Sequence, residues 1–152
     1  MTQWQCKKFD ELSKEELFQI FKARQDVFIV EQNCAYEDID GLDEEAWHLI
    51  GFNIDAQGSR NIKAYLRILA PRVKYSEISL GRVLVDVNER GSGLGQELIA
   101  QAISVAKEKF PDESIRISAQ HHLHRFYAKF KFESVSDPYD EDGIPHIEML
   151  KA

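Results

Sequence analysis

The stretch from Leu80 to Phe110, LGRVLVDVNERGSGLGQELIAQAISVAKEKF, joins a short apolar run to a glycine-rich turn that opens directly into a helix. The turn from Arg90 to Gly95 carries little side-chain bulk, and the first amide groups of the following helix have no partners within that helix. Those donors and the positive end of the helix dipole favour a phosphate. On local grounds alone, a plain helix cap explains the turn equally well.

The spacing of the glycines separates the known kinds of phosphate-binding turn. A Walker loop needs a lysine and a hydroxyl residue after its last glycine, and no lysine follows any glycine of this chain. A dinucleotide fingerprint needs G-x-G-x-x-G on a first strand, whereas Gly91, Gly93 and Gly95 run G-x-G-x-G beyond the middle of the chain. Neither nucleotide motif therefore fits.

The remaining pattern, Arg-x-x-Gly-x-Gly at Arg90, Gly93 and Gly95, resembles the acetyl-CoA site of the GNAT N-acyltransferases. The resemblance covers nearly the whole chain and points to the ElaA-like subgroup of that family. The segments that carry it are Glu31 to Asn33, Tyr36 to Gly41, Ala119 to Gln120, Phe126 to Tyr127 and Asp142 to His146. It implies the GNAT acyl-CoA N-acyltransferase fold of mixed α/β class, with helices flanking a central, mixed, splayed sheet of about six to seven strands.

Length and composition independently limit the number of domains, the class of partner and the cellular compartment. A chain of 152 residues suits a single domain over residues 1–152. The net charge of −7 disfavours nucleic acid and anionic membranes as partners and suits cationic substrates. Cys6 and Cys34 are isolated and predict reduced thiols, not a disulfide or zinc site. No signal peptide or membrane span is apparent, so we expect a cytoplasmic protein.

Hydrophobic periodicity predicts the elements of the first half. Ser13 and Glu16 form a capping box, which predicts a helix from there to about Val30. An acidic loop follows from Glu31 to Glu45. The expected strands lie near Trp4 to Cys6, over Trp47 to Ile54 and Ile62 to Ala70 as a hairpin, and over Ile78 to Val87.

The second half of the chain has the pattern of a crossover connection between two parallel strands. Strand 78–87, helix 93–109 and strand 115–119 form a strand-helix-strand unit, which requires parallel pairing and places ligand at the carboxyl ends of the strands. A short helix over 121–130 should follow, then strands at 132–135 and 146–150 joined by a loop from Asp137 to Gly143.

The resemblance assigns the coenzyme contacts. It implies that Leu84 and Val85 offer strand groups to the pantetheine arm, in a gap between strands 78–87 and 115–119. It also implies that turn amides hold the pyrophosphate, from Arg90, Gly91, Ser92, Gly93, Leu94 and Gly95. His121 stands where the family often has a coenzyme-contacting asparagine. It is a further candidate, with an exposed helix-start histidine as the alternative.

Tyr127 is the candidate general acid. A phenol can protonate the departing thiolate, although a lone tyrosine at helical spacing is more often a core aromatic. The segment from Phe126 to Phe132 matches the family's Phe-Tyr-x-x-x-Gly-Phe and favours the catalytic role. Lys131 replaces the glycine, so we expect a positive φ there at some energetic cost.

The base and the acceptor-binding residues are less clearly marked. Glu31 and His146 are the candidates for the base, with a structural role as the alternative for each. Arg67 and Arg82 could bind a substrate carboxylate or form internal ion pairs with Asp38 or Asp40. Tyr36 is a further candidate for substrate contact. No metal site is expected, because the three histidines of 121–124 spread around too wide an arc.

The combined hypothesis is an acyltransferase that moves an acetyl group from acetyl-CoA to a small primary amine by direct attack in a ternary complex. A non-catalytic coenzyme A-binding regulatory module and an acidic protein-interaction domain are the alternatives. An exposed edge strand near the C-terminus would suit a homodimer.

Overall fold

The computed structural model describes all 152 residues and has the mixed α/β class expected. The strands are β1 (Gln3–Lys8), β2 (Trp47–Ile54), β3 (Arg60–Leu69), β4 (Ile78–Val85), β5 (Ile115–Gln120), β6 (Glu133–Ser134), β7 (Tyr139–Glu141) and β8 (Ile144–Lys151). The helices are α1 (Lys14–Arg24), the π-helix η2 (Gln25–Glu31), α2 (Leu94–Lys109) and α3 (His124–Ala128), with 3-10 turns at Phe9–Glu11, Asp43–Glu45, Val87–Glu89 and His121–Leu123.

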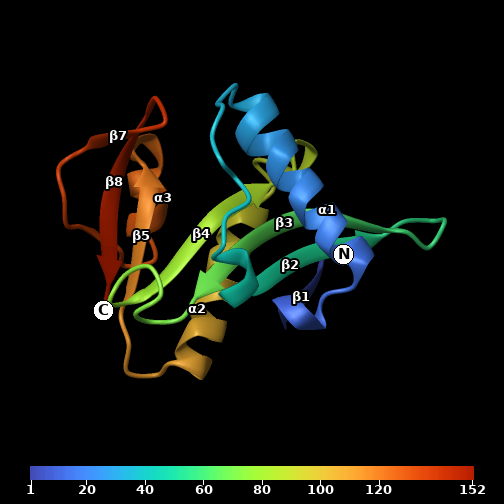
Figure 1. Ribbon diagram of the computed structural model, residues 1–152, viewed down its shortest axis with the longest axis horizontal. Helices are drawn as coiled ribbons and strands as arrows, with labels where there is room; N and C mark the ends of the chain where they lie inside the picture. Colours follow the sequence, from blue (N-terminus) through green and yellow to red (C-terminus); the bar gives the residue numbers. More distant parts are fainter.

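The strands form one sheet in the order β1-β2-β3-β4-β5-β8-β6, with β7 also paired to β8 (Figure 1). Every pairing is antiparallel except β4 with β5, which is parallel as the predicted crossover requires. The sheet has 8 strands, one more than the upper expectation, because two short strands pair along the single long strand β8. A mixed sheet with one parallel pair and flanking helices agrees with the architecture that the resemblance implies.

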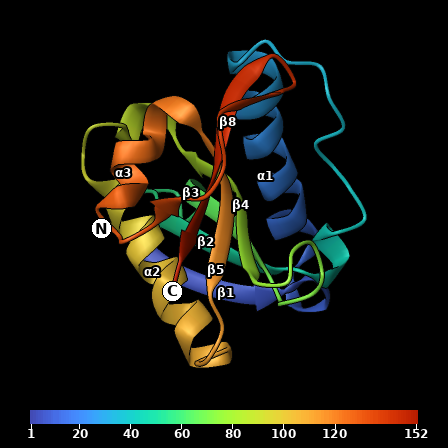
Figure 2. The same ribbon diagram turned by 90° about the vertical axis from the view of Figure 1, so that its left-hand side faces the viewer.

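Helices cover both faces of the sheet. Figure 2 shows α1 on one side and α2 with α3 on the other. Since side chains alternate along a strand, neighbouring residues enter different cores: Leu49 and Leu66 pack with α2, whereas Ile50 and Tyr65 pack with α1. The buried stripe of α2 that closes the larger core consists of Leu94, Leu98, Ile99, Ala102 and Ala106.

The first helix begins where the capping box predicts but changes type before its end. The Ser13 side chain accepts from the Glu16 amide, and the Glu16 carboxylate accepts from the Ser13 amide. The α-helix stops at Arg24, and the chain continues as a π-helix to Glu31. Arg24, the last residue of α1, is buried in ion pairs with Asp38 and Asp43, and the π-helix ends with Glu31 at the rim of a cleft.

The sheet is open between its two parallel strands. β4 and β5 pair only at Ile78 with Ile115 and Ser79 with Arg116. Beyond Gly81 a β-bulge sets Arg82 and Val83 opposite the single residue Leu66, and Arg82 has a φ of 53°. The extra residue bends β4 away from β5, so the expected splay is present.

One expected loop is wrong in part. Tyr139–Glu141 forms β7, which pairs with the start of β8 across a two-residue turn, Asp142 and Gly143. Both turn residues have positive φ, 52° and 82°, as a tight hairpin turn of this kind requires. The Asp-Gly dipeptide was the sequence signal for this hairpin.

Candidate active site

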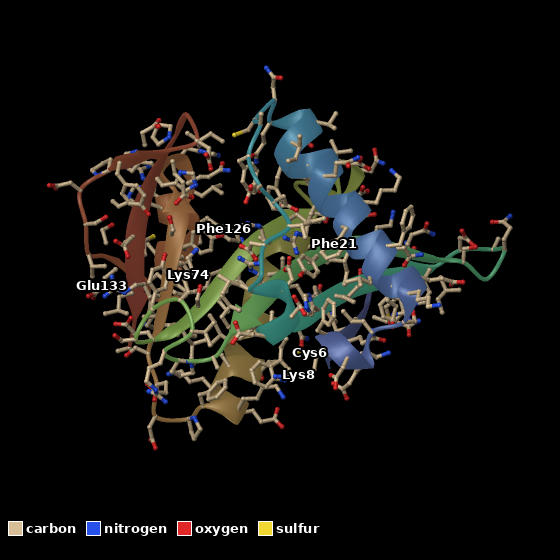
Figure 3. The ribbon with its side chains drawn as sticks, in the orientation of Figure 1. Cys6, Lys8, Phe21, Lys74, Phe126 and Glu133 are labelled. Carbon is tan, nitrogen blue, oxygen red and sulfur yellow. The ribbon has the colours of Figure 1, made fainter.

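A cleft of about 720 Å³ lies where β4 and β5 part. Its walls come from β4, β5, η2, the acidic loop, α3 and the β7–β8 hairpin. Lys74, on the loop before β4, and Phe126, on α3, are labelled in Figure 3, and both line the cleft. The cleft runs from the glycine turn at the start of α2 toward the closed end of the splay near Ser79.

The glycine turn presents unpaired donors to one end of this cleft. Gly91 and Gly93 have φ values of 83° and 90°, and residues other than glycine adopt such values only at an energetic cost. Ser92 is the exception among the turn amides, because it donates to the Glu89 carbonyl at 3.2 Å. The amides that donate no hydrogen bond within the protein are those of Arg90, Gly91, Gly93, Leu94, Gly95 and Gln96. The helix start is therefore uncapped and suited to an anion.

Arg90 and Glu31 form an ion pair at the mouth of the cleft. The Arg90 guanidinium donates through Nη1 and Nη2 to the two Glu31 oxygens, at 2.5 and 2.9 Å. This hydrogen bonding lowers the pKa of the Glu31 carboxyl. A carboxylate held in this way is a weaker base, so the geometry favours a positioning role for Glu31 over the proton-accepting one offered from the sequence.

The β4 residues expected to meet pantetheine line the same cleft. Leu84 is buried, Val85 is half-buried, and both belong to the part of β4 that has left β5. The Val85 carbonyl accepts from Arg90 Nε at 3.3 Å, which links this strand end to the glycine turn. The backbone groups at the end of β4 and the amides of the glycine turn thus lie next to each other along the cleft.

Tyr127 lies on α3 with its ring buried and its side chain on the cleft wall. It packs edge-on against Phe126 and Phe132, at centroid distances of 5.1 and 6.0 Å. Burial raises the pKa of its hydroxyl to about 12, so the proton is retained at neutral pH. The hydroxyl makes no hydrogen bond within the protein, which leaves its proton available to a bound molecule.

His146 faces the cleft from β8 and is held by its own strand. Its Nδ1 lies 2.7 Å from the Ile144 carbonyl and must carry the proton there, which leaves Nε2 as the basic nitrogen. Nε2 lies 3.4 Å from an oxygen of Glu141, which would stabilise the imidazolium after proton transfer. Sequence reasoning missed Glu141 because it expected a loop where β7 lies.

The two strand arginines meet carboxylates of the acidic loop. Arg67 is 2% exposed, and its Nη1 and Nη2 donate to Asp40 at 2.7 and 3.0 Å. Arg82 Nε lies 2.9 Å from Asp38, and its Nη2 lies 3.3 Å from Asp40. The internal ion pairs left open by the sequence are thus present, and the carboxylate-binding role loses support since these guanidinium groups are already neutralised. Arg67 does not line the cleft.

The acidic loop forms the opposite wall of the cleft. The Tyr36 ring lies 5.4 Å from the Arg82 guanidinium, and its hydroxyl donates to Asp38 at 2.8 Å. Tyr36 therefore reaches the cleft as a fixed wall residue. Cys34 Sγ donates to the Asp142 carbonyl at 3.2 Å and joins the loop to the tip of the β7–β8 hairpin.

The histidine run at the start of α3 is placed differently from the expectation. His121 is exposed, stacks on His124 with a centroid distance of 5.8 Å and does not line the cleft. Its neighbour His122 does line it. The 3-10 turn at His121–Leu123 rotates His121 outward, so its assignment as a coenzyme ligand loses support. None of the helices is long and apolar enough to cross a membrane.

Comparison with known proteins agrees with this geometry. Residues 56–152 match the model of the acetyltransferase (GNAT) domain family. A UPF0039 protein of Synechocystis is 43% identical over 97% of this chain and 93% of its own length. Protein ElaA of Escherichia coli is 38% identical over 99% of this chain and 97% of its own length.

Solved structures agree as well. The crystal structure of E. coli ElaA superposes with a TM-score of 0.92 at 37% identity, and an acyl-CoA N-acyltransferase from Pseudomonas aeruginosa does so with 0.92 at 36%. Each comparison covers 100% of both chains. The uncapped glycine turn beside a splayed pair of parallel strands and these similarities lead to one conclusion: the chain belongs to the GNAT acetyltransferase family, in its ElaA-like branch.

Proposed function

We propose that this chain, as a single domain over residues 1–152, is an N-acetyltransferase that moves the acetyl group of acetyl-CoA to a primary amine in a ternary complex. The observation that carries the proposal is the set of amides at the mouth of the β4–β5 cleft that donate no hydrogen bond within the protein, which are those of Arg90, Gly91, Gly93, Leu94, Gly95 and Gln96. The diphosphate of the coenzyme would accept from these amides, and its pantetheine arm would lie along Leu84 and Val85.

The side chains at the other end of the cleft have the chemistry for the transfer. His146 Nε2 takes one proton from the acceptor ammonium, so a neutral nitrogen attacks the thioester carbon and the C–N bond forms. The C–S bond breaks with its electron pair on sulfur, and Tyr127 donates its proton to that thiolate. Tyr127 regains a proton from the new amide nitrogen, and His146 releases its own to solvent. Placing amine and thioester together accounts for much of the rate, because the thioester is already activated.

The proposal extends to the setting of the enzyme. We place it in the cytoplasm with acetyl-CoA as cosubstrate and no metal. A homodimer stays a prediction; the sheet edge nearest the C-terminus is β6, which contains only Glu133 and Ser134. An edge of that length offers few hydrogen bonds to a second copy.

Calorimetry with acetyl-CoA and a screen of amines for free thiol release test the proposal together. We expect saturable coenzyme binding and acetyl-CoA-dependent thiol release with at least one class of amine. Binding without turnover over a broad panel would favour the regulatory coenzyme module. No binding at millimolar coenzyme would remove the transferase assignment.

Tyr127→Phe tests the acid. We expect turnover to fall by roughly 10² to 10⁴ with coenzyme affinity nearly unchanged, because only the proton donor is removed. Tyr75→Phe is the matched control, since Tyr75 lies on the loop before β4 and does not line the cleft. Unchanged turnover in Tyr127→Phe would exclude the acid role.

Paired variants separate the two base candidates. His146→Asn should lower kcat by roughly 10² or more, whereas Glu31→Gln should leave kcat within about threefold, because Glu31 is held by Arg90. The reverse order of the two effects would return the base to Glu31.

A further inference from the structure

The closed end of the cleft, beyond the residues assigned to the coenzyme, holds several charged side chains. Two of them neutralise each other: Arg82 Nη2 lies 3.3 Å from Asp40. Asp40 also accepts from Arg67 at 2.7 Å, and although burial opposes it, this hydrogen bonding lowers the pKa of Asp40 to about 2. The charges of Arg82, Arg67 and Asp40 therefore compensate one another without a ligand.

Lys74 is different. It lies on the loop between β3 and β4, lines the cleft, and forms neither an ion pair nor a hydrogen bond. Although the residue is exposed, desolvation of its ammonium, together with the charge of Arg67, lowers its pKa. The charges of Glu141 and Asp40 act on this pKa in the opposite sense, and the ammonium lies 5.4 Å from the centre of the Tyr75 ring.

A second group with spare charge lies on the β7–β8 hairpin. Glu141 has 49% of its side chain exposed, and its partner is His146, which is a charged partner only after it takes a proton. While His146 is neutral, Glu141 has no cation within ion-pair distance. The acceptor end thus presents an ammonium and a carboxylate that form no ion pair with each other, from different elements of the same cleft.

We infer that the acceptor is a zwitterion of the amino-acid kind, whose carboxylate binds the Lys74 ammonium while its amine lies at the Glu141–His146 pair. This inference rests on the proposed function and assigns the class of its acceptor. A diamine would bring a second cation against Lys74, and a neutral amine would leave the Lys74 charge uncompensated in the complex. An acceptor that carries both a carboxylate and an ammonium provides a counter-charge for Lys74 and for Glu141.

Matched acceptors test the inference. Thiol release from acetyl-CoA is measured with a panel of free amino acids and with the corresponding amino-acid amides, which keep the ammonium but lack the carboxylate. The wild-type protein should prefer at least one acid over its amide by about tenfold or more in kcat/KM, as expected for a charge-assisted contact.

Variants of Lys74 assign that preference to a residue. Lys74→Met should lower kcat/KM for the acid by about 10- to 100-fold and leave the amide nearly unchanged. Lys74→Arg should keep the preference, and Lys74→Glu should shift it toward diamines. Arg72→Met is the matched control, because Arg72 lies on the same loop with 74% of its side chain exposed and outside the cleft.

The outcomes distinguish a failure of the zwitterion inference from a failure of the transferase proposal. Thiol release with amines but with equal acid and amide rates, or a Lys74→Met preference equal to that of wild type, overturns the zwitterion inference and leaves the transferase proposal standing. No release with any acceptor overturns both. Coenzyme affinity measured by calorimetry on each variant shows whether the fold is retained.

Discussion

At the scale of single residues, Lys131 shows the cost of departing from a motif. Its φ is 71°, a left-handed conformation that costs a side chain about 1–2 kcal/mol. The sequence predicted a positive φ at this position, because glycine is the usual residue of the family there. The strain follows from local geometry alone and needs no knowledge of distant partners.

Lys131→Gly should therefore raise the free energy of unfolding by about 1 kcal/mol, once the extra freedom of glycine in the unfolded chain is deducted. Urea denaturation measures the difference. Lys129→Gly is the matched control and should destabilise by about the same amount, since Lys129 has a φ of −61° in the right-handed region. A loss of stability in Lys131→Gly would contradict the strain argument.

Residue roles that depend on distant partners could not be predicted. The glycine turn was identifiable because its spacing is local. The pairing of Glu31 with Arg90, 59 positions away, was not expected from the sequence. The pairing of Arg67 with Asp40, 27 positions away, was one of two alternatives, and only the fold decides between them. The sequence could name these side chains, but not which of them were already engaged.

At the scale of elements, Arg24, Arg67 and Arg82 hold the acidic loop against the sheet and α1 through ion pairs. Arg24 is fully buried and contacts Asp38 at 2.9 Å and Asp43 at 2.6 Å, while Arg67 reaches Asp43 at 3.0 Å. These ion pairs hold Tyr36 and Asp40 against the cleft. Elements with strong periodicity, such as α2, were predicted with nearly correct bounds. The π-helix was not, because nothing local distinguishes it from a continuing α-helix.

Asp43→Ala should destabilise the protein by about 3–5 kcal/mol, since it leaves Arg24 and Arg67 buried without one of their carboxylates. Asp26→Ala removes an exposed pair with Lys22 and should cost under about 1 kcal/mol. Urea denaturation of both variants is the measurement. A loss below about 1 kcal/mol in Asp43→Ala would mean that the loop is held by other contacts.

At the scale of the whole molecule, the buried charge network sets the response to acid. Burial opposes ionisation of Glu16, but hydrogen bonds from Ser13, Gln5 and Lys7 lower its pKa from 4.5 to about 2. A carboxyl with a depressed folded-state pKa contributes stability above its unfolded value, and that stability is lost as pH falls toward the folded value. Desolvation lowers the pKa of buried His48 from 6.5, so its contribution declines as pH falls below that value.

Stability should therefore decline gently below about pH 6.5 and steeply between about pH 4.5 and 2. Urea midpoints across this range give the profile. Glu16→Gln keeps an acceptor for the capping box but removes the titration, so its profile should be flatter in the acid limb. An acid limb as steep as that of wild type would assign the effect to other carboxyls.

The position of β8 governs how the chain can reach its native state. This strand is the last in sequence, yet it lies between β5 and β6 and also pairs with β7. The hydrogen-bonding edge of β5 on that side thus stays bare until Ile144–Lys151 arrives, and such an edge invites pairing with other chains. We therefore expect folding to be slow for a chain of this size and aggregation to be most pronounced just before β8 pairs with β5.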